Sequence, residues 1–266
     1  MKKKIGIYIF IIIIAVIVCI PLFSSSYNIY NDDGVQHVCR LMGTLQSIME
    51  GQTFSVIMSE FCNGFGYSWN LFYSPTTAYI PLIFHFITNS FVLDIKLFIL
   101  VVTVFTGVAM YHFMKTVTKN DNISILAAVI YILAPYRLTD MYIRMALAEL
   151  TSFIFLPIIF QGMYMIFQEE CSKSKKPEII LITGAVGLIL THLVMTMYTA
   201  IIALIYLIVN IKKLKNKVVL KKLLVSFLFI VCITSFFWMP LLEQKVSAEY
   251  EVFRERQNGK NGSTNL

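Results

Sequence analysis

The stretch IGIYIFIIIIAVIVCIPLF (Ile5–Phe23) follows three lysines, Lys2–Lys4, and carries no charged residue. About 20 apolar residues are needed to cross the ~30 Å hydrocarbon core of a bilayer. A cleaved signal peptide is the alternative, but the run is long and no A-x-A-like cleavage site follows Pro21. We therefore expect a retained anchor with a cytoplasmic N-terminus, which places Ser24 and the residues after it outside.

The composition extends this reading to the whole chain. Of the 266 residues, 58% are hydrophobic and the mean hydropathy is +0.74, whereas soluble domains have roughly 45–50% apolar residues. The net charge of +7 comes from lysines beside apolar runs, which is typical of orientation signals and not of nucleic-acid binding. These features predict an all-α polytopic protein of the cell membrane, with the lipid bilayer as its partner and no nucleic acid.

The positions of the lysines restrict the topology. Later apolar segments lie at about 75–91, 92–114, 122–136, 147–167, 178–209 and 222–241. We interpret Tyr73–Asn89, which carries two prolines, as a re-entrant or juxtamembrane helix, and 178–209 as two short spans that turn near His192. All lysine clusters are then cytoplasmic: Lys2–Lys4, Lys115/Lys119, Lys173/Lys175/Lys176 and Lys212–Lys222. The result is about seven spans, with the first outer loop at 24–91.

An amphipathic helix is predicted directly after the anchor, in NDDGVQHVCRLMGTLQSIM (Asn31–Met49). Apolar residues recur there at spacings of three and four, at Val35, Val38, Met42, Leu45 and Met49. Asp33, His37 and Arg40 share another face. Such a helix should lie along the membrane interface, and we interpret it as the floor of an active site.

Asp32 and Asp33 have two readings. An acid before Gly34 could cap the helix and favour its dipole. Alternatively, one of the two could act as a general base that takes a proton from an attacking hydroxyl. His37 and Arg40, one and two turns further on, favour the catalytic reading.

A second set of ionisable residues lies at Arg137, Asp140, Arg144 and Glu149. They could be interface anchors with an exposed Asp140–Arg144 ion pair. Glu149 has apolar neighbours, however, and ionisable groups at membrane depth indicate function. Arginine also binds phosphate through two donors at once. His192, in a predicted outer turn, is either a packing residue or part of the same site.

The segment Asn63–Pro75 is rich in glycine and aromatic residues. It lacks the strand–helix setting of a nucleotide-binding loop. It could be an interfacial aromatic belt or a wall, including Tyr73, for a sugar ring or lipid headgroup. Cys39 and Cys62 would share the first outer loop, either as a disulfide or as two unpaired thiols. No zinc-type spacing is present.

Several motifs carry a resemblance to a known family. They are Asp33-x-x-x-His37-x-x-Arg40, Gly51, Asn63-Gly-Phe-Gly, Phe72-Tyr-x-Pro75, Tyr142-x-Arg144-x-Ala146-x-Ala148-Glu149 with Pro157, and Thr191-His192. Together they resemble bacterial membrane proteins labelled 6-pyruvoyl-tetrahydropterin-synthase-related, among the GT-C-type glycosyltransferases. The resemblance covers most of residues 5–241, and nothing in the sequence suggests pterin chemistry.

The resemblance implies a GT-C-like bundle over residues 1–242, followed by a polar, disordered outer tail at 243–266. It implies a cell-envelope transferase that takes a sugar from a polyprenyl-phosphate carrier on the outer face. Such enzymes usually continue with more spans, so a missing C-terminal part or a partner subunit is expected. A lipid-linked-sugar or solute transporter and a non-catalytic assembly protein are the alternatives.

The residue roles follow from the same resemblance and from the residues themselves. Asp33 maps to the base or metal-binding acid, and the Asp140–Glu149 region maps to the donor phosphate. A divalent metal is an open alternative that no spacing indicates. The expected catalytic residues are Asp33, Asp32 and Glu149, and the expected substrate-binding residues are His37, Arg40, Arg144, Asp140, His192 and Tyr73.

Overall fold

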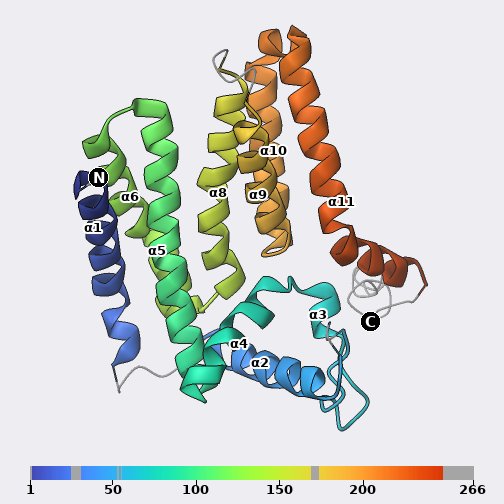
Figure 1. Ribbon diagram of the computed structural model, residues 1–266. Helices are drawn as coiled ribbons and strands as arrows, with labels where there is room; N and C mark the ends of the chain where they lie inside the picture. Colours follow the sequence, from blue (N-terminus) through green and yellow to red (C-terminus); the bar gives the residue numbers. More distant parts are fainter. Residues whose placement is uncertain (1, 25–30, 53, 55, 169–173, 248–266) are drawn as a thin grey trace, which may run out of the picture.

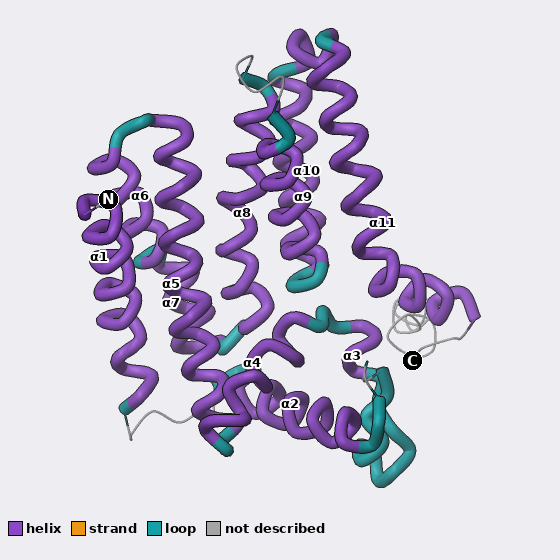
Figure 2. Tube along the Cα trace, in the orientation of Figure 1, coloured by secondary structure: helices purple, strands orange, loops and turns teal. Residues whose placement is uncertain are grey.

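The computed structural model describes residues 2–24, 31–52, 54, 56–168 and 174–247, and every named element in these residues is a helix (Figures 1 and 2). The elements are α1 (Lys2–Cys19), η1 (Ile20–Phe23), α2 (Gly34–Met49), α3 (Trp69–Phe72), α4 (Thr76–Thr88), α5 (Phe91–Thr118), α6 (Asp121–Ile132), α7 (Pro135–Thr139), η2 (Asp140–Arg144), α8 (Leu147–Ile166), α9 (Lys176–Ile189), α10 (Leu193–Val209), η4 (Ile211–Lys215) and α11 (Lys217–Ser247). These elements confirm the all-α prediction.

Within the described residues, four helical segments are long and apolar enough to span a membrane: Lys4–Phe23, Phe91–Thr118, Leu147–Ile166 and Lys217–Gln244. A fifth candidate is the pair formed by α6 and Pro135–Arg144, which is bent by 41°. The predicted break near His192 is present, because α9 ends at Ile189 and α10 begins at Leu193. With 14 and 17 residues, each of these two helices is shorter than the four spanning segments.

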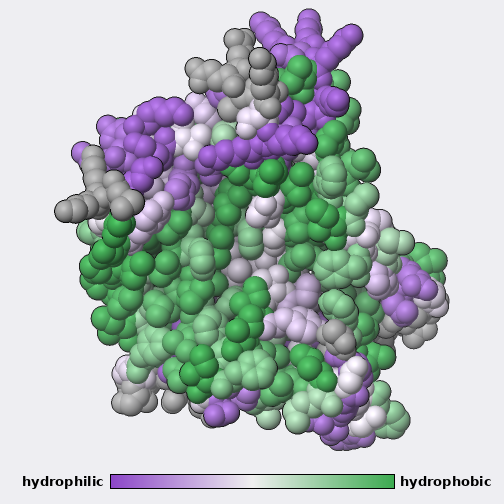
Figure 3. Space-filling view, in the orientation of Figure 1, coloured by the Kyte–Doolittle hydropathy of each residue, from purple (hydrophilic) through white to green (hydrophobic). Residues whose placement is uncertain are grey.

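The long helices lie side by side, and the bundle has two chemically different ends (Figure 1). The N-terminus, the α5–α6 turn and the α10–α11 connection lie at the upper end, where hydrophilic side chains gather above a broad hydrophobic band (Figure 3). Helices α2, α3 and α4 lie across the lower end (Figure 1). The lysine clusters within the described residues therefore share one end of the molecule, and the first loop covers the other.

Small residues allow α8 and α9 to approach closely. A Cβ on Gly162 would lie 2.6 Å from the backbone nitrogen of Leu181, and one on Gly184 would lie 2.8 Å from that of Ile159. Close backbone approach through glycine is a common device in membrane bundles, where lipid provides no hydrophobic drive for helix association. The two glycines therefore set the distance between α8 and α9.

Helix α2 turns its polar face inward. Its apolar residues Val35, Met42 and Met49 are exposed, whereas His37 and Arg40 are buried at 5% and 1% exposure. A soluble helix would show the reverse arrangement. An exposed apolar stripe of this kind is what a helix lying along a membrane interface would show.

Other expectations for the first loop and the tail have mixed outcomes. Cys39 and Cys62 are both free thiols, so the disulfide alternative is wrong. The segment predicted as a juxtamembrane helix forms α4 (Thr76–Thr88). Most of the predicted disordered tail, residues 248–266, lies outside the described residues, as does Cys171.

Candidate functional site

Arg144 is the centre of the ionic network at the lower end of the bundle. Its Nη1 donates to Asp140 Oδ1 at 2.7 Å, to Glu149 Oε2 at 2.8 Å and to the Tyr136 hydroxyl at 3.2 Å. Tyr136 in turn donates its hydroxyl proton to Glu149 Oε1. Asp140 is fully buried, whereas the Arg144 side chain is 39% exposed. One guanidinium nitrogen thus holds two carboxylates, and the Arg144 side chain remains partly exposed.

An unusual backbone segment arranges these groups. Asp140–Arg144 forms a turn of π-helix after the short helix α7. Met145 then adopts a left-handed conformation, with φ at 55°, and α8 begins two residues later. Single π-helical turns occur often at functional sites, and a left-handed methionine is costly unless its surroundings enforce it. The segment brings Asp140, Arg144 and Glu149 together although the chain between them is not one regular helix.

Asp33 adjoins this network through the backbone. The Asp33 N–H donates to the Arg144 carbonyl at 3.0 Å, and the Asp32 N–H reaches the Ile143 carbonyl at 3.4 Å. Asp33 occupies the N-cap position of α2, but its side chain makes no capping hydrogen bond. The carboxylate of Asp33 therefore does not cap α2. Burial raises the pKa of Asp33 above its ordinary 3.8, while Arg144 acts to lower that pKa and Asp32 to raise it.

Arg40 has a different environment from the one expected for a substrate-binding residue. Its donors reach Asn70 Oδ1 and Thr77 Oγ1 at 2.9 Å, and the backbone carbonyls of Tyr73 and Ser74 at 3.2 and 2.8 Å. Its guanidinium also lies 4.4 Å from the centroid of the Tyr73 ring. Burial lowers the pKa of Arg40 to about 10, which leaves it charged at neutral pH. Arg40 ties α2 to the segment between α3 and α4.

His37 lies beneath the same aromatic residue. Its ring is 6.4 Å from that of Tyr73, centroid to centroid, and it bonds the backbone of Met145. Burial, assisted by the charge of Arg40, lowers the pKa of His37 to about 4, so the ring is neutral at pH 7. Its Nε2 is buried without a hydrogen-bond partner among the described residues.

His192 lies within electrostatic range of Glu149 and Arg144. Its Nδ1 accepts a hydrogen bond from the Met195 N–H at 3.0 Å and so caps α10. A neutral ring with an accepting Nδ1 carries its proton on Nε2, which leaves an N–H donor beside the site.

The structure brings the predicted site residues together. Tyr73 responds electrostatically to Asp33, Glu149 and Arg144, and burial is the main cause that raises its pKa. The start of α4 is fixed to the turn before α10, because the Thr76 hydroxyl donates to the Leu190 carbonyl at 2.6 Å. Asp33, Tyr73, Arg144, Glu149 and His192 thus lie within electrostatic range of one another. Arg40 and His37 are buried beside Tyr73, and Asp32 is exposed.

Two features were missed in the sequence. Tyr136 bonds both Arg144 and Glu149, and the signal for it was its position next to a set of charged residues. His85 has its Nδ1 2.7 Å from Oδ2 of the fully buried Asp94, a pairing that the sequence did not indicate. Thr88 donates to the other oxygen of Asp94. This pair joins the end of α4 to the start of α5 and is a separate cluster.

No group of three His, Cys, Asp or Glu side chains that could hold a metal ion occurs in the described part of the chain. Asp140 and Glu149 are instead bridged by Arg144. A cavity of about 1050 Å³ lies elsewhere, beside the lysines of η4 and α11.

Helices fit to span a bilayer and a polar site at one end of their bundle define the class, an all-helical membrane protein. The chain belongs to the family described as "6-pyruvoyl-tetrahydropterin synthase related domain; membrane protein", whose model matches residues 71–253. A protein of Lactococcus lactis subsp. cremoris (strain MG1363), named "Uncharacterized protein", is 27% identical over 259 residues. The match covers 94% of this chain and 42% of that protein, so the chain spans less than half of its relative. No solved structure matches.

Proposed function

We propose that the chain forms the membrane-embedded core of a GT-C-type glycosyltransferase, which moves a sugar from a polyprenyl-phosphate donor to an acceptor on the outer face. The observation that carries the proposal is the partly exposed side chain of Arg144 near the carboxylate of Asp33, which makes no capping hydrogen bond to α2. Arg144 bonds its protein partners through Nη1, and no hydrogen bond from Nε or Nη2 occurs among the described residues. Two free donors in a planar fork suit a phosphate.

The proposed chemistry assigns a task to each group. Asp33 accepts the proton of the acceptor hydroxyl, the hydroxyl oxygen forms a bond to the anomeric carbon, and the bond from that carbon to the phosphate oxygen breaks. The polyprenyl phosphate leaves with the bonding electrons, and Arg144 stabilises its charge. The raised pKa of Asp33 makes it a stronger base than an ordinary aspartate. Tyr73 and the Nε2–H of His192 would contact the sugar or phosphate.

Asp140 and Glu149 would hold Arg144 in place. Their carboxylates bond a single nitrogen of it at 2.7 and 2.8 Å, which fixes the plane of the guanidinium. A preorganised donor stabilises developing charge without reorganising during the reaction. In this assignment Glu149 positions Arg144, whereas Asp33 is the catalytic base.

For the topology we propose seven spans with a cytoplasmic N-terminus, formed by α1, α5, α6 with the bent segment after it, α8, α9, α10 and α11. Helices α9 and α10, of 14 and 17 residues, extend about 21 and 25 Å, which is less than the ~30 Å of hydrocarbon. Their turn at His192 would then lie within the membrane, where polar backbone is tolerated only if it lines protein or a polar cavity. The bonds from Thr76 supply such a lining.

The direct test is transfer from radiolabelled polyprenyl-phosphate sugars in membranes that contain the full chain. Asp33→Asn should abolish transfer, because the amide cannot accept the proton, while the neighbouring Asp32→Asn variant should retain most of it. If Asp33→Asn transfers sugar at the wild-type rate, Asp33 is not the base. A transporter would keep its flux in Asp33→Asn, and an assembly protein would tolerate alanine at Asp33, Arg144 and Glu149 in a complementation assay.

A further inference from the structure

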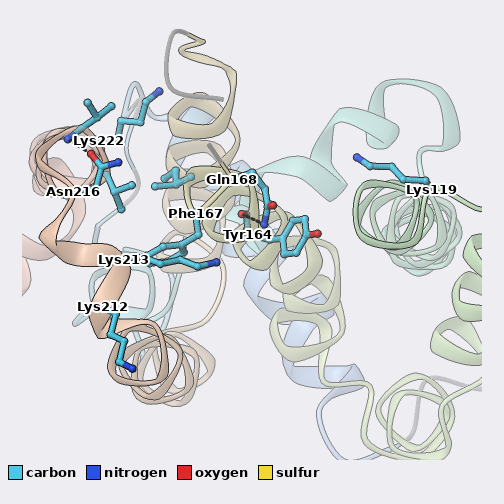
Figure 4. Close-up of a pocket in the computed structure, with 11 residues that line it drawn as sticks. Lys119, Tyr164, Phe167, Gln168, Lys212, Lys213, Asn216 and Lys222 are labelled. Atoms are coloured by element: carbon cyan, nitrogen blue, oxygen red, sulfur yellow. Dashed lines mark hydrogen bonds between the residues drawn. The ribbon is translucent and has the colours of Figure 1, made fainter. Parts of the chain in front are cut away.

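A second polar site lies at the lysine-rich end of the bundle, opposite the acidic network. It is a cavity of about 1050 Å³ bordered by the end of α5, the end of α8, η4 and the start of α11. Its polar lining comes from Lys119, Lys212, Lys213, Lys222, Asn216, Tyr164 and Gln168. Figure 4 shows Lys213 beside Phe167, with Lys222 and Asn216 on α11 and its approach, and Lys119 on the far side. Residues distant in sequence thus build one basic pocket.

The pocket has an excess of positive charge. Lys222 is 8% exposed and is paired, because its Nζ lies 2.9 Å from Glu178 Oε2. Lys119, Lys212 and Lys213 form no ion pair within the described residues, and no acidic side chain is among the residues that line the cavity. Glu169 and Glu170 follow Gln168 in the sequence and lie outside the described residues. Three lysines around one cavity favour an anionic ligand.

Apolar side chains form the rest of the pocket wall. Ile166, Phe167, Val218 and Val219 line it between the lysines. A second hollow of about 840 Å³ shares Val218 and Lys222 with the first and continues between α9 and α11. Its lower lining is Ile179, Ile182, Val225, Phe229 and Ile233. A free phosphate would make no contact with this apolar surface, whereas a lipid carries acyl chains beside its anionic headgroup and could fill both parts.

We propose that this pocket binds the phosphate group of an anionic membrane lipid, with the acyl chains in the groove between α9 and α11. Lys212 and Lys213 contact the phosphate, and Lys119 faces it across the cavity. Basic pockets between membrane helices commonly hold such headgroups. The site is separate from the proposed transferase site and does not depend on it.

The test uses the full chain purified in a mild detergent and native mass spectrometry, with dioleoyl phosphatidylglycerol as the probe and dioleoyl phosphatidylcholine as the neutral comparison. Phosphatidylglycerol should be retained in preference to phosphatidylcholine. The double variant Lys212→Gln/Lys213→Gln should bind phosphatidylglycerol about 25-fold more weakly, since each lysine near an anionic lipid contributes about fivefold. Both lysines are exposed, so the variant should fold.

The matched control is Lys4→Gln/Lys176→Gln, which removes the same charge at the same end from residues that do not line the cavity. This control should retain phosphatidylglycerol like the wild type. Equal losses of phosphatidylglycerol binding in the two double variants would overturn the proposal. No loss in either variant would also overturn it, and this is the result expected if Glu169 or Glu170 neutralises the lysines. Binding of inorganic phosphate together with no preference for phosphatidylglycerol over phosphatidylcholine would assign the pocket to a soluble anion and reject the lipid.

Discussion

At the scale of single residues, Asp33 predicts a specific pH dependence. A general base works deprotonated, and burial raises the pKa of Asp33 above 3.8, so the acidic limb of the kcat/KM profile should lie above pH 3.8. The negative charge of Asp32 contributes to this shift. Asp32→Asn should therefore move the limb to lower pH, by a few tenths of a pH unit because the exposed charge is screened.

The control for this measurement is substitution of Glu50, an exposed acid at the far end of α2, to glutamine, which should leave the limb unchanged. A limb that shifts to higher pH in Asp32→Asn would contradict the assignment. The raised pKa of Asp33 also affects the free energy of unfolding. Its stabilising contribution is fully present below the pKa of the unfolded state and is lost as the pH rises through the pKa of the folded state.

The buried carboxylate of Asp140 depends on Arg144. Arg144→Met would leave Asp140, which is fully buried, and Glu149 as like charges without their shared cation. Because Arg144 is partly exposed, we expect a loss of about 1–3 kcal/mol in unfolding free energy, below the usual cost of breaking a buried pair. Adding Asp140→Asn should recover part of that loss, measured by thermal unfolding in detergent. Equal stability of Arg144→Met and of the double variant would contradict a charge-based role for Arg144.

The sequence predicted which residues meet but not which way they face. Asp33, Arg144 and Glu149 were expected to act together, and the structure joins them through the Asp33–Arg144 backbone bond and the Arg144–Glu149 ion pair. Arg40, which was expected to bind substrate, instead donates hydrogen bonds to Asn70, to Thr77 and to two backbone carbonyls. Charge and spacing do not reveal that such internal acceptors exist, since they come from a segment 30 residues later.

At the scale of elements, helix boundaries could be predicted where apolar runs end in polar residues. The predicted amphipathic helix after Asp33 corresponds to α2, which begins at Gly34, and the long run 178–209 divides at His192. The π-helical turn at Asp140–Arg144 could not be predicted, because its backbone is fixed by contacts from α2: the Asp33 N–H on the Arg144 carbonyl and His37 on Met145. Tertiary hydrogen bonds decided the local conformation there.

The α8–α9 contact predicts a strong effect from a single methyl group. Gly162→Ala would place a Cβ 2.6 Å from the backbone nitrogen of Leu181, and backbone atoms cannot move aside as a side chain can. We expect a loss of about 1–3 kcal/mol. Gly6→Ala on α1 is the matched control, since a Cβ there meets nothing within 4 Å, and alanine should stabilise that helix by about 0.5–1 kcal/mol. Equal melting temperatures for the two variants would contradict the close packing of α8 on α9.

At the scale of the whole molecule, the lysines gave the most reliable information. They were expected on one side because each cluster borders an apolar run, and in the fold Lys119, Lys212, Lys213 and Lys222 line one cavity although they come from separate helices. Asp140 and Glu149 lie at the other end, around Arg144, whereas Asp121 and Glu178 pair with lysines at the lysine-rich end. Charge segregation along the sequence therefore predicted which ends of the helices meet, even where helix lengths alone identify four or five candidate spans.

This segregation leads to a prediction about the two faces of the membrane. In a cysteine-free background, Cys62 restored alone should react with a membrane-impermeant maleimide on intact cells, because it is exposed in the first loop, on the proposed outer face. Lys215→Cys, at an exposed position in η4, should react only after the cells are permeabilised. Cys62 and Lys215 lie at opposite ends of the helix bundle (Figure 1). If the helices between these ends span the membrane, the bilayer separates the two positions. Labelling of both positions on intact cells would place the lysines outside, against the charge rule, and would remove the proposed orientation of the transferase site.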